Sequence, residues 1–268
     1  MKSTIATLMI GILAIPALAD QCSTKPDKAE EKEEAGIYEL RTYTTNEGKL
    51  KNLHARFRDH TIRIFEKHGM KSLGYWVPTD EKKSKNTLIY ILKHKSLEAA
   101  KASWKAFGRD PEWRKVAKES QVDGKILAKR PEKVFLKATG YSPNAFKGNP
   151  DNKEKICQLR IYHIKDDMSK KLHERFEKGT VKLFAKHGIE SLCYLQPLDK
   201  EQEDKMLYYI IRFKDKAATK LAWKAFVSDP EWHKFRKPYG KPVAKAVNTF
   251  MTATDYSATV KKEEKKSE

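Results

Sequence analysis

The sequence predicts an α+β protein in which two tandem ferredoxin-like (βαββαβ) domains pack sheet-to-sheet as one intramolecular α/β barrel. Three observations lead to this fold class. The chain repeats itself after 119 residues, both copies show the same order of strand and helix patterns, and a ferredoxin-like sheet has helices on only one face. Because the bare face of such a sheet must be buried, we expect the two bare faces to pack together.

The repeat spans almost the whole chain. An offset of 119 residues carries Ile37 onto Ile156, and 19 of the 44 positions that follow Ile37, counting it, are identical in the two copies. The phrase WKAFGRDPEW, from Trp104, recurs with the same offset as WKAFVSDPEW. A period this long indicates a duplicated domain rather than a solenoid. The predicted boundaries are 36–142 for the first domain, 143–154 for a linker and 155–257 for the second domain.

Each element of the first copy has its own residue pattern. IYELRTY alternates as a half-buried strand does, and residues from about 47 to 68 place apolar side chains at helical spacing before Gly69 stops the helix. SLGYWV and TLIYILK are the next strands. Ser96 caps a second helix, the pair Asp110-Pro111 starts a short third helix, and VFLKAT forms the last strand. The second copy repeats each of these signals.

The first strand has one apolar and one polar face. Alternation places Tyr38 and Leu40 on one side, and Glu39, Arg41 and Tyr43 on the other. We expect the first side to meet the helices and the second side to face the interior of the barrel. The second copy repeats this split.

Polar and aromatic side chains of the interior are the candidate ligand-binding residues. A buried Arg needs an anionic partner, so Arg41 predicts either a pocket for a carboxylate- or phosphate-bearing ligand or an internal pair with Glu39. The Tyr and His candidates either line the lumen or pack against the helices. The lumen candidates are Arg41, Tyr43, Arg160, Tyr162, Tyr75, Tyr194, His54 and His173.

Other basic residues of the long helix have structural explanations. His68 and His187 stand at helix C-termini, where the helix dipole favours a positive charge. Surface ion pairs would explain Arg56 and Arg175. No His, Cys and carboxylate set has metal-ligand spacing and no Gly-rich phosphate loop is present, so we expect neither a metal nor a cofactor.

The ends of the chain indicate export. Residues 1–19 combine one Lys, a short apolar run and small residues before Asp20, which is typical of a cleaved signal peptide. We therefore expect a periplasmic or extracellular protein without a transmembrane segment after cleavage. Lipid anchoring through Cys22 is an alternative, although Asp20 and Gln21 stand where a lipobox has small residues. The remaining end segments are a polar linker at 20–35 and a charged tail at 258–268.

The net charge of +19 suggests attraction to anionic partners. The Lys residues are scattered and interleaved with Glu, whereas nucleic-acid binding needs a concentrated basic footprint, so nucleic acid is not an expected partner. An anionic surface or a protein partner stays open. Cys157 and Cys193 lie on strands that flank a third strand in the ferredoxin-like order, so they are expected about 10 Å apart as buried thiols without a disulfide.

The motifs resemble one known family. The run IYELRTY, a helix ending in KHG, the strand SLGYW and the phrase WKAFGRDPEW are similar to those of the NIPSNAP domain, and the second copy resembles it as well. The resemblance implies a dimeric α/β-barrel fold, often with two such domains per chain. It also implies kinship with small monooxygenases and with barrel proteins that hold ligands in the lumen. It transfers no catalytic residue.

Two classes of function follow from these patterns. The first is a protein that binds a small acidic or aromatic ligand in the barrel lumen, or that acts as a cofactor-independent oxygenase-like enzyme. The second is a non-catalytic interaction module that binds a protein partner or envelope polyanions through its basic surface.

Overall fold

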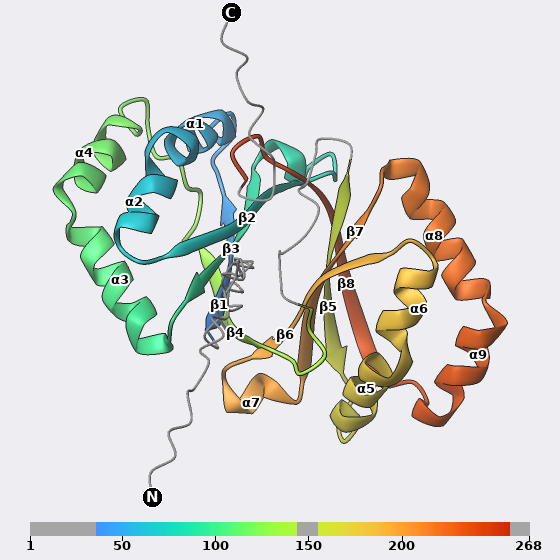
Figure 1. Cartoon of the computed structure of the whole chain (residues 1–268). Helices are drawn as coiled ribbons and strands as arrows, with labels where there is room; N and C mark the ends of the chain where they lie inside the picture. Colours follow the sequence, from blue (N-terminus) through green and yellow to red (C-terminus); the bar gives the residue numbers. More distant parts are fainter. Residues whose placement is uncertain (1–35, 144–154, 258–268) are drawn as a thin grey trace, which may run out of the picture. The chain divides into compact units, whose positions relative to one another are not determined.

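Residues 36–143 and 155–257 are described by the computed structural model, and they form two sets of elements whose strands and main helices follow the same order (Figure 1). The first set is β1 (Ile37–Thr44), α1 (Leu50–Arg56), η1 (Phe57–Thr61), α2 (Ile62–Lys67), β2 (Lys71–Pro78), η2 (Lys83–Lys85), β3 (Thr87–His94), α3 (Leu97–Arg109), α4 (Pro111–Glu119) and β4 (Glu132–Ala138). The second set is β5 (Ile156–Ile164), α5 (Ser169–Arg175), η3 (Phe176–Thr180), α6 (Val181–Lys186), β6 (Glu190–Pro197), α7 (Lys200–Glu203), β7 (Met206–Phe213), α8 (Lys216–Ser228), α9 (Pro230–Arg236), η4 (Lys237–Tyr239) and β8 (Val243–Ala253). The predicted signal peptide 1–19, the linker 20–35 with Cys22, most of the linker 143–154 and the tail 258–268 lie outside the described residues.

The eight strands close into one antiparallel barrel in the order β1-β3-β2-β8-β5-β7-β6-β4. Each half supplies four neighbouring strands. The halves are joined by hydrogen-bonded seams, β2 with β8 and β4 with β6, in which Trp76 pairs with Ala253 and Leu136 pairs with Pro197. The protein therefore has a mixed α/β fold with a closed barrel, as predicted. The edge-to-edge seams add a second connection between the halves, which the repeat did not predict.

Apolar side chains from every strand fill the barrel interior. Tyr38 and Leu40 of β1 belong to this cluster, whereas Glu39, Arg41 and Tyr43 do not. The predicted orientation of the first strand is therefore wrong, because the polar face of β1 lies under the helices. The buried members of the interior cluster are Tyr38, Leu40, Leu73, Trp76, Ile89, Ile91, Leu136, Cys157, Leu159, Leu192, Cys193, Leu195, Ile210 and Met251.

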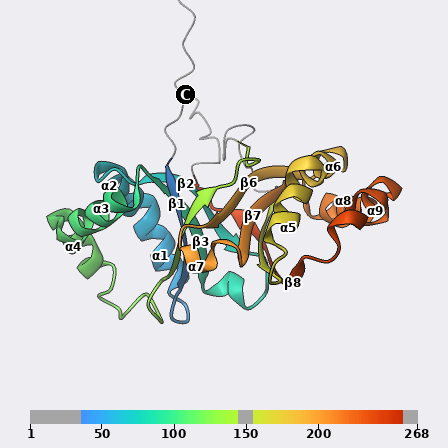
Figure 2. The same cartoon turned by 90° about the horizontal axis from the view of Figure 1, so that it is seen from below.

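The helices lie on the outer side of the strands of their own half (Figures 1 and 2). Each long helix predicted before a KHG motif is observed, but a π-helical turn, η1 or η3, interrupts it in the middle. Gly69 and Gly188 end these helices with positive φ angles of 73° and 70°, a backbone region that Gly adopts at no steric cost. Two further apolar clusters lie between the helices and the barrel, one in each half.

The KHG and DPEW motifs meet at the ends of these helices. Asp110 caps α4 as predicted, and its carboxylate also accepts hydrogen bonds from Lys67 Nζ at 2.8 Å and from His68 Nε2 at 2.7 Å. These hydrogen bonds hold the pKa of Asp110 well below its usual range. His187 and Asp229 repeat the 2.7 Å contact. In each half, the repeated phrase WKAFxxDPEW thus connects the helix that ends at KHG with the helix that begins at DPEW.

The segments that follow β4 and β8 each form hydrogen bonds with the other half. Tyr141 OH lies 2.8 Å from His173 Nδ1 on α5, and Tyr256 OH lies 2.6 Å from His54 Nδ1 on α1. The hydroxyl of Ser142 accepts a hydrogen bond from the backbone N–H of Tyr194 at 3.0 Å. The similar motifs KATGYS (137–142) and TATDYS (252–257) therefore each connect one half to the other, and we call these two contacts clasps.

Loss of one clasp hydroxyl should weaken the fold modestly. We expect Tyr141→Phe and Tyr256→Phe each to lower the free energy of unfolding by about 1 kcal/mol, the usual net contribution of one hydrogen bond. Urea denaturation at pH 7, followed by circular dichroism, measures the change. The control is Tyr239→Phe, whose hydroxyl has no hydrogen-bond partner among the described residues. Unchanged urea midpoints in both clasp variants would show that these hydrogen bonds do not stabilise the fold.

The buried thiols agree with their prediction. Cys157 and Cys193 are both buried and neither forms a disulfide. Burial raises the pKa of Cys193 to about 12, so this thiol is inert at neutral pH. Within residues 36–143 and 155–257, no helix is long and apolar enough to span a membrane.

Candidate functional site

The structure places none of the predicted lumen residues in the barrel interior. Tyr43 and Tyr75 pack in the helix-side cluster of the first half, and Tyr162 and Tyr194 pack in that of the second half. His54 and His173 lie on helices and form the two clasps. The guanidinium groups of Arg41 and Arg160 lie over the rings of Trp104 and Trp223, 4.2 and 4.6 Å from the ring centroids. Any site that uses these residues lies between sheet and helices.

Glu39 is the centre of a buried polar network in the first half. Its side chain is fully buried and accepts hydrogen bonds from Arg41 Nη1 at 2.6 Å and from Trp104 Nε1 at 2.7 Å, while His94 Nε2 lies 3.0 Å away. Burial alone would raise the pKa of Glu39, but His94, the charge of Arg41 and Trp104 together lower it. Arg41 is thus neutralised internally, which is the alternative that the sequence left open.

The second half lacks this carboxylate. Gln158 replaces Glu39 and accepts the hydrogen bond of Trp223 Nε1 at 3.0 Å. Arg160 instead donates to Tyr209 OH at 2.6 Å and to Tyr162 OH at 2.9 Å. Burial raises the pKa of Tyr209 well above its usual value, so its phenol stays neutral at physiological pH. The guanidinium of Arg160 is therefore hydrogen-bonded to two phenol oxygens, where Arg41 pairs with a carboxylate.

A second arginine in each half is buried without an acidic partner. Arg56 is 7% exposed and Arg175 is 9% exposed, so the surface ion pairs predicted for them are wrong. Among the described residues, no carboxylate lies within ion-pair distance of either one. The Nε atom of each is buried without a hydrogen-bond partner, and the Nη1 donor of Arg56 reaches Ser120 Oγ only at 3.4 Å. Burial lowers the pKa of both groups, yet a guanidinium keeps its charge.

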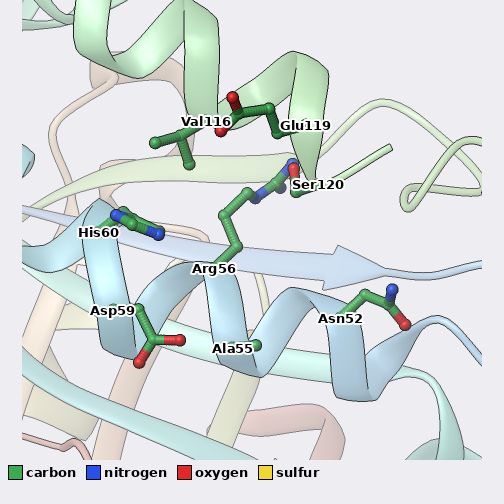
Figure 3. A pocket seen from close by; sticks show the side chains of 8 residues that line it. All are labelled: Asn52, Ala55, Arg56, Asp59, His60, Val116, Glu119 and Ser120. Carbon is green, nitrogen blue, oxygen red and sulfur yellow. The ribbon is translucent and has the colours of Figure 1, made fainter. Parts of the chain in front are cut away.

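Arg56 stands between an outer hollow and an inner cavity. The hollow, of about 270 Å³, lies between α1 and α4, and in Figure 3 the Arg56 side chain crosses it toward Ser120. The inner cavity, of about 200 Å³, also has Arg56 in its wall, and half of its lining residues are aromatic. The cavity is lined by Tyr43, Arg56, Phe57, Thr61, Phe65, Phe107, Trp113, Ala117, Gln121 and Leu127.

The π-helical turn positions this arginine. Thr61 Oγ1 donates to the backbone carbonyl of Arg56 at 3.0 Å, and Thr180 makes the same bond to Arg175 at 2.9 Å. Such turns are frequently found at functional sites, because the extra residue redirects neighbouring side chains. The guanidinium of Arg56 lies 5.3 Å from the centroid of the Trp113 ring, the last residue of the repeated phrase. The site thus joins a cation to aromatic walls.

Each half of the chain matches the same family. The family model for NIPSNAP matches residues 38–143 and again 157–258, well over half of the chain. The chain belongs to the NIPSNAP family. This confirms the resemblance that the strand and DPEW motifs indicated. Among curated proteins, none matches this NIPSNAP chain.

Solved structures share the fold of this NIPSNAP protein. A candidate monooxygenase from Lactobacillus acidophilus has a TM-score of 0.53 at 12% identity and covers 82% of this chain and 94% of its own. A candidate monooxygenase from Fusobacterium nucleatum has the same TM-score and identity, with 82% and 92% covered. A NIPSNAP family protein of unknown function from Agrobacterium tumefaciens has a TM-score of 0.35 at 23% identity, covering 41% of this chain and 94% of its own. At 12% identity, the likeness to the two candidate monooxygenases shows a shared fold alone.

Sequence reasoning missed Arg56 although the chain contained a signal for it. Arg56 lies three residues after Leu53, on the same stripe of the helix that carries the apolar contacts. The Arg also recurs at the repeat offset as Arg175, while its neighbours Ala55 and Arg58 do not. An Arg that stands on the apolar stripe of a helix in both halves of this NIPSNAP protein predicts a buried guanidinium. Among the described residues, no three His, Cys, Asp or Glu side chains are grouped to hold a metal.

Proposed function

We propose that this NIPSNAP protein binds a small organic anion in the first-half cavity, with the ligand's carboxylate paired to Arg56. The observation that carries this proposal is the buried guanidinium that has no carboxylate partner among the described residues and borders a 200 Å³ aromatic cavity. A buried charge is costly unless it is paired, so a carboxylate entering this space would relieve that cost. The predicted acidic or aromatic ligand is kept, but its place moves from the lumen to the space between sheet and helices.

The size and lining of the cavity narrow the ligand further. Pockets for drug-sized molecules have volumes of roughly 300–1,000 Å³, so a cavity of about 200 Å³ suits a single ring with a carboxylate. Phe57, Phe65 and Phe107 offer aromatic edges and faces to such a ring. Arg presents two parallel N–H donors that match the geometry of a carboxylate. These features favour an aromatic acid.

A binding titration tests this proposal. We expect Arg56→Met to weaken the binding of salicylate about tenfold to hundredfold, because hydrogen bonds to charged groups contribute about 1.5–3 kcal/mol. Isothermal titration calorimetry on the full chain gives the dissociation constants. Arg63→Met is the matched control, because Arg63 lies on the same long helix with its side chain exposed against Glu112. The Met variant should fold at least as stably as the wild type, since it removes an unpaired buried charge.

Failure of this test would favour the other class of function. If salicylate and related acids do not bind, or bind equally well to Arg56→Met, the cavity is not an anion site. Salt-sensitive retention of the same protein on heparin would then support the non-catalytic module that uses its basic surface on a protein partner or on polyanions.

The finer proposal is an oxygenase-like reaction on the bound acid. It is supported by the likeness in fold to candidate monooxygenases and by the aromatic side chains that line the cavity. Without a cofactor, the electrons that reduce O₂ must come from the substrate, so a phenolic acid is the substrate class. Oxygen uptake in the presence of phenolic acids, lost in Arg56→Met, measures it.

We also infer that the barrel arose from two ferredoxin-like units by duplication. The support is the strand order β4-β1-β3-β2 in one half and β8-β5-β7-β6 in the other, with helices in equivalent places. Export remains a prediction from residues 1–19.

A further inference from the structure

The second half contains a counterpart of the Arg56 site with a different entrance. The offset of 119 residues carries Arg56 onto Arg175, His60 onto Gly179, and Val116 onto Phe235. In the first half, His60 and Val116 stand at the hollow beside Arg56, one on each side of the gap between the two helices (Figure 3). The second half therefore exchanges a large and a small residue across the same gap.

Phe235 packs directly on the helix backbone at Gly179. A Cβ atom at residue 179 would lie 2.5 Å from the Phe235 ring, so only Gly leaves room for it. The ring continues into an aromatic row, with centroids 6.4 Å from that of Trp232 and 5.3 Å from that of Tyr239. Tyr239 stands at the position of Ser120, the residue that faces Arg56 in the first half. Large rings thus occupy the place of the outer hollow.

Charge does not distinguish the two halves at this point. Arg175 is buried to about the same degree as Arg56, and neither has a carboxylate partner within the described residues. The Nε atom of Arg175 is buried without a hydrogen-bond partner, as that of Arg56 is, so the second half also holds a buried cation without an acidic partner among the described residues. The halves differ instead in the residues beside the arginine, which are His60, Val116 and Ser120 in the first half and Gly179, Phe235 and Tyr239 in the second.

We propose that Phe235 closes the second-half counterpart and that, of the two equivalent arginines, Arg56 is the one at an accessible anion site. The proposal rests on the proposed function, which it deepens by naming the residues that decide access. His60 and Val116 leave the first entrance open, whereas Gly179 and Phe235 close the second. The duplicated fold would thereby carry one working site and one sealed copy.

Arginine modification by phenylglyoxal tests access without a known ligand. The full chain is treated with the reagent, and modification of each Arg is followed by peptide mass spectrometry. We expect Arg175 to react about tenfold more slowly than Arg56, because a sealed side chain reacts only through local opening. In Phe235→Val, Arg175 should react at about the rate of Arg56. The reciprocal variant His60→Gly/Val116→Phe should slow the reaction of Arg56 by a similar factor.

The outcomes separate this proposal from the proposed function. Equal rates at Arg56 and Arg175 in the wild type, or no acceleration in Phe235→Val, would overturn the sealed copy. If salicylate fails to slow the reaction of Arg56, the proposed ligand site is lost, but the comparison of the two arginines still stands. Circular dichroism melts show whether each variant is folded. If Phe235→Val unfolds, the reciprocal variant decides: an Arg56 rate that does not fall would equally overturn the sealing.

Discussion

Replacing Glu39 with Gln is expected to lower the free energy of unfolding at pH 7 by about 3 kcal/mol, the cost of breaking a buried ion pair on one side. The substitution removes the only carboxylate that the described structure places within ion-pair distance of Arg41. His94 and Trp104 would keep a neutral acceptor at best. Urea denaturation followed by tryptophan fluorescence measures the loss.

The effect of Glu39→Gln should depend on pH. Hydrogen bonds and the charge of Arg41 outweigh burial and lower the pKa of Glu39 in the folded state. A carboxyl group with a lowered pKa stabilises the fold above its unfolded pKa, about 4, and loses that contribution as the pH falls through its folded pKa. The difference between wild type and variant should therefore be full near neutrality and shrink in acid. A difference that stays constant down to pH 3 would contradict this origin.

The second half supplies the matched control. Gln158 occupies the position of Glu39, and Arg160 is two residues away on the same face of the strand. We expect Gln158→Glu to change the stability by less than about 1 kcal/mol, because the new carboxylate gains a cationic partner that offsets its desolvation. If Glu39→Gln and Gln158→Glu lowered the free energy of unfolding equally, the shape of the side chain and not its charge would explain both effects.

Replacing Gly74 with Cys should destabilise the protein by about 3 kcal/mol, the upper end of the usual cost of overpacking. A Cβ atom at Gly74 would overlap the ring of Trp76. That ring is fully buried in the barrel interior, where hydrogen-bonded strands surround it on all sides.

The other half again provides the compensating change. At the equivalent positions, Cys193 and Leu195 pack side by side in the same interior cluster. The double variant Gly74→Cys/Trp76→Leu should therefore be more stable than the sum of its two single variants predicts, by about 1–3 kcal/mol of coupling between contacting residues. Thermal unfolding of the wild type, the two single variants and the double variant measures this coupling. Simple additivity would show that the two side chains do not compete for space.

The fold was predictable to the extent that local patterns specify it. The repeat predicted the same order of elements twice, and the caps at Asp110 and Asp229 are observed where the sequence placed them. Capping and periodicity are readable because they act between residues that are close in sequence. The π-helical turns were missed, since one extra residue in a turn hardly disturbs the apolar spacing.

The candidate site was predictable only in part. Alternation separates Arg41 and Tyr43 from Leu40, but it is unchanged when the two faces of a strand are exchanged. The choice depends on Trp104, a distant residue whose indole N–H satisfies the buried carboxylate beside Arg41 under the helix. The surface ion pair predicted for Arg56 likewise followed from its charge and not from its position on the apolar stripe of the helix.

By itself, the sequence determined the family, the repeated motifs and the order of strands and main helices, because these depend on residue identities and on periods of a few residues. The tertiary structure decided that the polar face of β1 lies under the helices, that the edges of both sheets join into a closed barrel, and that Arg56 is buried beside a cavity. Those outcomes depend on which distant groups can satisfy a buried charge and on which side chains fill a shared volume. Such contacts join residues that lie far apart in the sequence, so no periodic pattern of residues reveals them.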